Sequence, residues 1–210
     1  NDEGKLIILT NLSNGKREII ESKSVNNNFF SKIFANETSK INIFNNNNWF
    51  CKVFSSQYKL VIIGAVHISE SLVKLANILN FKVFLIDPRN NFDKSNFKNI
   101  AQLLTEWPDE GLKKININNK TCIVTLTHDP KLDDPAIIYS LNSDPLYIGC
   151  LGSVRTHDAR IKRLSKKGFS KKDLSKINGP IGLNINAKTP AEIACAIIAE
   201  IISKKNNNAI

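Results

Sequence analysis

The 210-residue sequence contains no methionine and begins at Asn1, which predicts a fragment or a processed form of a longer chain. It also lacks any apolar run near the roughly 20 residues that a membrane-spanning helix needs. Leu6–Leu9 is too short for the hydrophobic region of a signal peptide. We therefore expect a protein that has no membrane span and lies in the cytoplasm.

Cysteine is sparse, and none of the four cysteines forms a C-x-x-C pair, which argues against a zinc or dithiol redox motif. Cys122, Cys150 and Cys195 fall inside apolar runs and are expected to be small buried core residues. Free cysteines suit a reducing cytoplasm. No serine-nucleophile or activated-cysteine pattern is present, so we expect no catalytic residues and no metal site.

Acidic residues are outnumbered, with 19 Asp and Glu against 29 Lys and Arg, which gives a net charge of +10. Such a charge attracts nucleic acid, anionic lipid or phosphorylated ligands. The main cluster runs from Arg155 to Lys172. It lacks the interleaved aromatic residues of a single-strand-binding surface. We therefore interpret it as a solvated basic surface and expect no nucleic-acid partner.

The sequence does contain one strongly organised stretch, from Lys59 to Arg89. Lys59–Ile63 and Lys82–Ile86 are short β-branched runs, typical of strands buried on both faces. Between them, apolar residues recur at helical spacing, at Ile68, Leu72, Leu75, Ala76 and Leu79. This pattern predicts a right-handed βαβ unit, the first part of a nucleotide-binding sheet.

The glycine fingerprint of that unit is incomplete. A G-x-G-x-x-G motif would place glycine at 64, 66 and 69, but the chain has Gly64, Val66 and Ser69. Val66 puts a branched side chain where a pyrophosphate approaches the backbone. Asp87 closes the second strand, where a dinucleotide fold holds a ribose hydroxyl. The stretch predicts the fold and argues against ordinary NAD binding, and a purely structural βαβ unit stays possible.

Strands and helices alternate from 59 to 205, so we predict an α/β fold with a Rossmann-like, doubly wound parallel sheet and a small β-rich N-terminal remnant. The predicted domains are residues 1–55 and 56–210. Further strands are expected at Ile100–Thr105, Thr121–Leu126 and Leu146–Leu151, with a polar loop at Asn90–Lys98. Helices are expected from Asp109, from about Asp133, after Ser153 and from Pro190. Asp133 or Asp134 would be the N-cap of the second of these helices, with Pro135 in its first turn, and Ser153 the N-cap of the third. In the N-terminal part we expect a hairpin of the strands Lys5–Thr10 and Arg17–Ile20, a further strand at Trp49–Phe54, and a helix at Phe29–Phe34.

Ligands of such sheets bind outside the carboxyl ends of the strands, where the unusual residues of this chain gather. A strand order of 3-2-1-4-5 would make all three histidines, His67, His128 and His157, converge. The histidines could bind a metal with Asp129, or His67 or His128 could act as a general base. They could also only hydrogen-bond their loops. An anionic ligand held by Ser153, a helix N-terminus and Arg155 is physically more plausible.

Six segments resemble a known family: LVIIGAVHI, LIDPRNNF, EWPDE, VTLTHDPKLDDPAI, YIGCLGSVRTHDARIKRL and GPIGLNINAKTPAEIACAIIAEI. Together they are similar, over about residues 50–205, to the C-terminal domain of the XdhC/CoxI family. Its members are accessory proteins of xanthine dehydrogenase and related molybdenum hydroxylases. Val66 departs from the glycine of many members, and residues 1–49 resemble the end of the family's N-terminal domain.

The resemblance implies a chaperone that binds molybdenum cofactor (molybdopterin) as cargo and delivers it to a xanthine dehydrogenase-type molybdoenzyme. It also implies a cysteine desulfurase-type sulfurating enzyme as a partner, and a homodimer. Sheet topology suggests the cofactor-binding residues: Gly64, Ala65, His67, Asp87, Arg89, Thr127, His128, Asp129, Gly152, Ser153 and Arg155. Two alternatives are an NAD(P)-binding oxidoreductase and a regulatory nucleotide-binding module.

Overall fold

The computed structural model describes residues 6–21, 30, 33, 39–44, 47–54, 56–89 and 92–207. The chain divides into two compact units. One is Gln57–Lys205, and the other is Asn1–Ser56 together with Asn206–Ile210. Within the described ranges, every helix is too short or too polar to cross a lipid bilayer.

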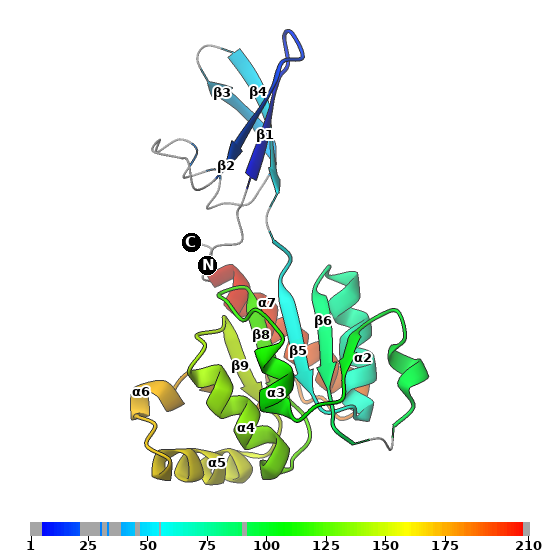
Figure 1. Ribbon diagram of the computed structural model, residues 1–210, viewed down its shortest axis with the longest axis vertical. Coiled ribbons are helices and arrows are strands. Elements are labelled where there is room, and N and C mark those ends of the chain that lie inside the picture. The colour runs from blue at the N-terminus through cyan, green and yellow to red at the C-terminus, as the bar shows by residue number, and fades with distance from the viewer. Residues whose placement is uncertain are drawn as a thin grey trace. The chain divides into compact units, whose positions relative to one another are not determined.

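The larger unit is built on a six-stranded parallel sheet in the order β10-β9-β8-β5-β6-β7 (Figure 1). The strands are β5 (Lys59–Ile63), β6 (Lys82–Ile86), β7 (Gln102–Leu104), β8 (Thr121–Thr125), β9 (Tyr147–Cys150) and β10 (Ile177–Asn178). The first five of these strands have the order 3-2-1-4-5 that was considered from the sequence. β10 adds an edge strand of two residues, which is too short to show a strand pattern in the sequence.

Helices cover both faces of this sheet, which confirms the doubly wound α/β fold (Figure 1). Leu60 and Ile62 of β5 face the helices α2 (His67–Ile78) and α7 (Pro190–Asn207). Val61 and Ile63 face the opposite layer, which contains α3 (Pro108–Lys113) and α4 (Pro130–Leu141). α5 (Val154–Lys166) packs beside α4. Two short helices complete the unit, η2 (Lys94–Phe97) and α6 (Lys171–Leu174).

The helix after β8 begins earlier than predicted. We expected it to start near Asp133, with Asp133 or Asp134 as N-cap and Pro135 in its first turn. Instead, Asp129 is the N-cap of α4 and accepts a hydrogen bond from the amide of Lys131 at 2.9 Å. Pro130 takes the first helical position, where its missing N–H costs nothing. Pro135 therefore lies inside the helix.

Two of the three cysteine predictions are confirmed, and one is wrong. Cys122 and Cys150 are buried, and burial raises the pKa of their thiols to about 12 and about 11. Cys195 is exposed. It lies in an apolar run, but the buried side of α7 is formed by its neighbours Ala194, Ala196 and Ile197.

The smaller unit contains a four-stranded antiparallel sheet in the order β2-β1-β4-β3. The strands are β1 (Leu6–Asn11), β2 (Arg17–Glu21), β3 (Lys40–Phe44) and β4 (Asn47–Phe54). The predicted β1–β2 hairpin is confirmed. β3 was not predicted. The helix expected over Phe29–Phe34 lies mostly outside the described residues.

Candidate functional site

The turn between β5 and α2 uses its own amides inside the protein. The Gly64 amide donates to the carbonyl of Ile86, and the Ala65 amide donates to Oδ2 of Asp87 at 2.7 Å. The Val66 amide donates to the hydroxyl of Ser69 at 3.2 Å. A pyrophosphate-binding turn points such amides at its ligand. In this turn the amides instead form hydrogen bonds within the protein, and these bonds stabilise the turn itself.

Gly64 and Ser69 explain the altered fingerprint. Gly64 has a φ of 107°, and a Cβ there would lie 2.6 Å from Cγ2 of Thr127. Glycine is thus required both by the backbone and by the close approach of the β8 loop. Ser69 is fully buried, and its hydroxyl donates back to the carbonyl of Gly64. The third glycine of the fingerprint is replaced by a side chain that closes the turn.

Asp87 anchors this turn. Its carboxylate accepts from the Ala65 amide, from the Arg89 amide, and from Nε and Nη2 of Arg89, all within 2.9 Å. Burial would raise the pKa of Asp87, but these hydrogen bonds outweigh it and hold the pKa below its usual value. Four bonds fill the acceptor capacity of a carboxylate. The geometry therefore favours a positioning role for Asp87 over the expected contact with a ligand hydroxyl.

Arg89 remains partly available to a ligand, because its side chain is 39% exposed. The Asp87 carboxylate raises the pKa of Arg89 against the opposing effect of burial. The charges of Asp129 and Asp133 raise it further. Arg89 therefore lies within electrostatic range of the N-terminus of α4. Its two side-chain hydrogen bonds to Asp87 fix this cation beside the β5–α2 turn.

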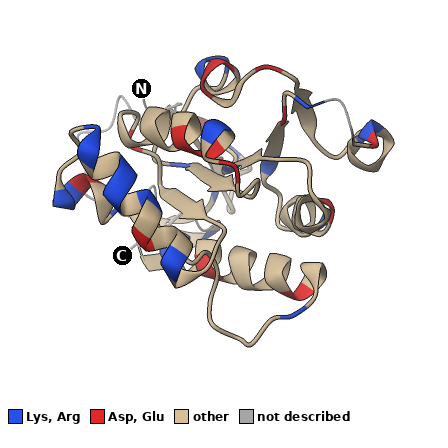
Figure 2. Cartoon of the chain, turned by 90° about the horizontal axis from the view of Figure 1, so that it is seen from below, with Lys and Arg blue, Asp and Glu red and all other residues tan. Residues whose placement is uncertain are grey.

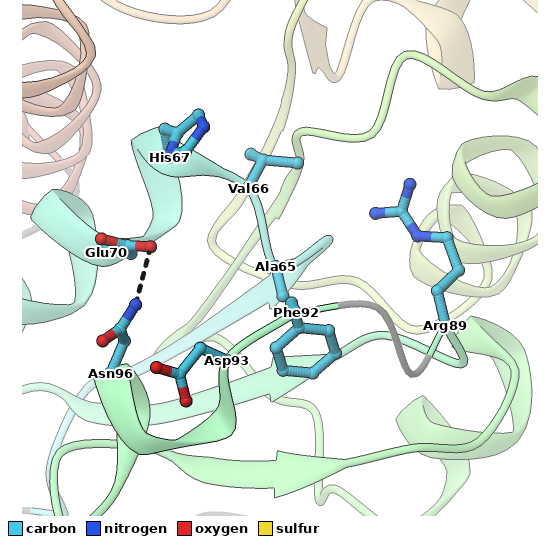
Figure 3. A pocket seen from close by; sticks show the side chains of 8 residues that line it. All are labelled: Ala65, Val66, His67, Glu70, Arg89, Phe92, Asp93 and Asn96. Atoms are coloured by element: carbon cyan, nitrogen blue, oxygen red, sulfur yellow. Dashed lines mark hydrogen bonds between the residues drawn. The ribbon is translucent and has the colours of Figure 1, made fainter.

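A pocket of about 480 Å³, here called the turn pocket, opens beside this turn (Figure 3). Figure 3 shows the residues of the turn and α2 on one side and those that follow β6 on the other. Its lining is Ala65, Val66, His67, Glu70, Arg89, Phe92, Asp93 and Asn96. Ala65, His67 and Arg89 were predicted site residues. The other five were missed, and three of them belong to a stretch expected to be polar loop, Asn90–Lys98.

The loop after β8 is locked by hydrogen bonds. The Thr127 hydroxyl donates to Oδ1 of Asp133 at 2.7 Å and accepts from the Asp129 amide at 3.1 Å. His128 has a φ of 60° and is exposed. The predicted residues Thr127 and Asp129 therefore shape this loop, while His128 is the side chain that it presents.

A second pocket, of about 250 Å³ and here called the helix pocket, lies between α4 and α5. Its lining is His128, Pro130, Asp133, Arg155, Thr156, Ala159, Arg160 and Arg163. His128 and Arg155 were predicted site residues. Ser153 is the predicted N-cap of α5 and accepts from the Thr156 amide at 3.2 Å. Gly152, before it, has a φ of 140°, and a Cβ there would lie 2.9 Å from Cγ2 of Thr156.

Arg160 is the main residue of this pocket that sequence reasoning missed. The basic stretch of α5 was interpreted as a solvated surface, and Figure 2 shows Lys and Arg along that helix. Arg160, however, is only 2% exposed. It precedes the buried Leu164 by one helical turn, which is the signal that would have placed it on the inner face.

The three histidines do not share one site. His67 lines the turn pocket and His128 lines the helix pocket. His157 packs against Gly179, where a Cβ would lie 2.1 Å from its Nδ1. Burial lowers the pKa of His157, and the charge of Arg160 lowers it further. Among the residues that the structure describes, no three His, Cys, Asp or Glu side chains are grouped as metal ligands would be.

Comparison with known proteins finds a matching family model and several similar proteins. Residues 60–201 match the family model described as the XdhC Rossmann domain. The chain is 31% identical over 72% of its length to a protein of Bacillus subtilis (strain 168) that is named a probable xanthine dehydrogenase subunit. It is 31% identical over 41% of its length to the "Molybdenum cofactor insertion chaperone PaoD" of Escherichia coli (strain K12). The "Uncharacterized protein YqeB" of the same strain is 28% identical over 71% of the chain.

A solved structure has the same fold. A crystal structure described as a xanthine dehydrogenase from Bacillus halodurans superposes with a TM-score of 0.73 at 24% identity, over 97% of this chain and 60% of that chain. The chain spans 44% of the length of the Bacillus subtilis relative, and 27% and 28% of PaoD and YqeB. Because the family model covers most of the sequence, the chain belongs to the XdhC family, with residues 60–201 forming its XdhC Rossmann domain.

Proposed function

We propose that this protein is a chaperone that binds molybdenum cofactor and delivers it to a xanthine dehydrogenase-type molybdoenzyme. The observation that carries the proposal is the turn pocket beside a turn whose amides are already used. A dinucleotide would need those amides for its pyrophosphate, whereas the pocket next to them is open. The names of PaoD and of the Bacillus subtilis relative support molybdenum cofactor and xanthine dehydrogenase as cargo and client.

The turn pocket has the chemistry that a pterin ring requires. A pterin is a flat heterocycle with N–H donors along one edge. Phe92 offers an aromatic surface, and the carboxylates of Glu70 and Asp93 are acceptors for such donors. Glu70 is held by Nδ2 of Asn96 at 3.1 Å, so that it is oriented before any ligand arrives. Arg89 adds a fixed positive charge at the same pocket.

The proposed contacts with the cofactor are made by Ala65, His67, Arg89, His128 and Arg155. The other residues of the predicted set support them by shaping the turns and caps: Gly64, Asp87, Thr127, Asp129, Gly152 and Ser153. In this account the protein binds and protects its cargo and performs no reaction on it. A sulfurating enzyme as second partner, a homodimer and a cytoplasmic location complete the proposal.

The proposal is tested by reconstitution of apo-xanthine dehydrogenase with molybdenum cofactor and the full-length protein. We expect the wild type to increase the recovered dehydrogenase activity. Arg89→Gln should reduce this effect about tenfold or more, because a charge-assisted contact contributes roughly 1.5–3 kcal/mol. Glutamine can still donate a hydrogen bond to Asp87.

Lys74→Ala is the matched control, since Lys74 is an exposed cation on α2 outside the lining of the turn pocket. If Arg89→Gln and Lys74→Ala activate the dehydrogenase equally well, Arg89 does not belong to the binding site. No activation by the wild-type protein, together with micromolar NAD(P)H binding, would favour the oxidoreductase or nucleotide-binding alternatives instead.

A further inference from the structure

Arg160 is a buried cation with unused hydrogen-bonding capacity. Its side chain is 2% exposed, and its Nη2 donates to the carbonyl of Leu151 at 2.9 Å. Within the described part of the chain, neither its Nε nor its Nη1 has a hydrogen-bond partner. Leaving a buried charged donor unpaired costs at least as much as a lost hydrogen bond. Such a group points to a missing acceptor.

The nearby carboxylates do not supply that acceptor. Oδ2 of Asp133 lies 3.9 Å from Nη2 of Arg160, beyond hydrogen-bond distance. The other oxygen of Asp133 accepts from the hydroxyl of Thr127. Asp134 is taken by Arg163, whose Nε and Nη2 donate to it at 3.1 and 3.0 Å. Arg160 is therefore paired with Asp133 by charge alone, and its Nε and Nη1 are left without an acceptor among the described residues.

The pocket that Arg160 lines has the other parts of an oxyanion site. Arg155 is exposed and lies in the first turn of α5, where the helix dipole favours a negative charge. The Thr156 hydroxyl lies 3.0 Å from that of Ser153, so one of these two groups can turn its proton toward a ligand. His128 borders the pocket from the β8 loop. Two arginines, in addition to the Arg163 that is bonded to Asp134, a hydroxyl and a helix N-terminus thus surround one small pocket.

We propose that the helix pocket binds a tetrahedral oxyanion of the phosphate class, and that the buried guanidinium of Arg160 contacts this anion. An oxyanion seated between Arg155 and Thr156 supplies the negative charge that Asp133 only partly provides. The source of this group is the phosphate end of the cofactor, a part of the inference that rests on the proposed function. The pterin would then occupy the turn pocket, which Arg89 lines.

The test is a calorimetric titration of the full-length protein with inorganic phosphate, against chloride at equal ionic strength. We expect saturable binding of phosphate, and binding about tenfold or more weaker in Arg155→Ala and Arg160→Lys. Arg155 is exposed, so its variant does not depend on how well the core tolerates a change at Arg160. Lys162→Ala removes an exposed cation from the same helix and should leave phosphate binding unchanged.

Two results would overturn the inference. The first is phosphate binding no tighter than that of chloride. The second is equal weakening by Lys162→Ala and Arg155→Ala, which would indicate a diffuse basic surface.

A further titration then separates the two possible sources of the phosphate group. If the pocket serves the cofactor, bound cofactor abolishes phosphate binding; if both bind together, the pocket takes free phosphate and the assignment to the cofactor is wrong, while the proposed chaperone function stands.

Discussion

Two buried aspartates at the site respond to their surroundings in opposite ways. Asp87 has a pKa below its usual value because hydrogen bonds from Arg89 and Ala65 outweigh burial. Asp133 has a raised pKa because burial outweighs the Thr127 hydrogen bond and the charge of Arg160. Ionised Asp87 therefore stabilises the fold, whereas ionised Asp133 costs free energy of folding. Asp87 holds the β5–α2 turn. Asp133 lies in the helix pocket and only partly balances the charge of Arg160.

Asp87→Asn should destabilise the protein by roughly 2–4 kcal/mol at pH 7, since it leaves Arg89 without its charged partner. The folded-state pKa of Asp87 is lowered, so its contribution is present above the unfolded pKa near 3.8 and is lost as pH falls through the folded value. The variant should therefore lose stability less steeply than the wild type below about pH 4.

Urea denaturation at pH 7 and across the acid range measures both effects. Asp144→Asn is a suitable control, because Asp144 is 88% exposed in its ion pair with Lys176 and should change stability by no more than about 0.5 kcal/mol. Asparagine also tolerates the positive φ of 51° at that position. If the Asp87→Asn variant is as stable as the wild type, the turn does not depend on this carboxylate.

At the scale of elements, helix N-termini supply most of the site. α2, α4 and α5 all begin at the carboxyl edge of the sheet, after β5, β8 and β9. Two of them are capped by side chains, Asp129 for α4 and Ser153 for α5. These caps fix where the first turns lie, and therefore where His128, Arg155 and Thr156 stand. The helix pocket is a product of this capping.

The Ser153→Asp variant keeps the helix cap of α5 but adds a negative charge beside the helix pocket. Aspartate caps a helix about as well as serine, so α5 should keep its stability within about 0.5 kcal/mol. The added negative charge beside the helix pocket should weaken phosphate and cofactor binding by about tenfold. Calorimetric titration measures the affinity, and Ser153→Asn, which has the same shape without the charge, is the control. Equal affinity in both variants would place the bound oxyanion away from the first turn of α5.

The sequence predicted those elements whose signals are local. β5 and β8 are uninterrupted apolar runs between turn residues, and they became the buried centre of the sheet. The start of α4 was missed because Asp129-Pro130 also suits the end of a loop, and only the hydrogen bond to Lys131 distinguishes the two. The buried Arg160 was missed because a charge in a basic stretch is usually solvated.

The turn pocket could not be predicted in full, because its two sides are distant in the chain. Phe92, Asp93 and Asn96 reach α2 only through the folding of the segment after β6. The hydrogen bond from Asn96 to Glu70 follows from tertiary packing, for which the local sequence has no periodic signal. The predicted residues Ala65, His67 and Arg89 were found because they immediately follow strands. Residues at strand ends are thus predictable from topology, and residues on intervening loops are not.

At the scale of the whole molecule, two pockets lie along the carboxyl edge of one parallel sheet. Arg89 lines the turn pocket and lies within electrostatic range of Asp133, which lines the helix pocket. The turn pocket is aromatic and acidic, while the helix pocket is basic. This arrangement suits a ligand with a heterocycle at one end and an anionic group at the other. The net charge of +10 adds a general attraction for such an anion. Both properties agree with the proposed role as a carrier of a phosphorylated pterin.

The most direct test of this account is equilibrium gel filtration of the full-length protein with molybdenum cofactor, followed by measurement of molybdenum in the protein peak. We predict that molybdenum co-elutes with the protein at a fixed ratio, and that excess NADH does not displace it. A protein peak without molybdenum, from a sample that binds NADH with micromolar affinity or better, would contradict the account.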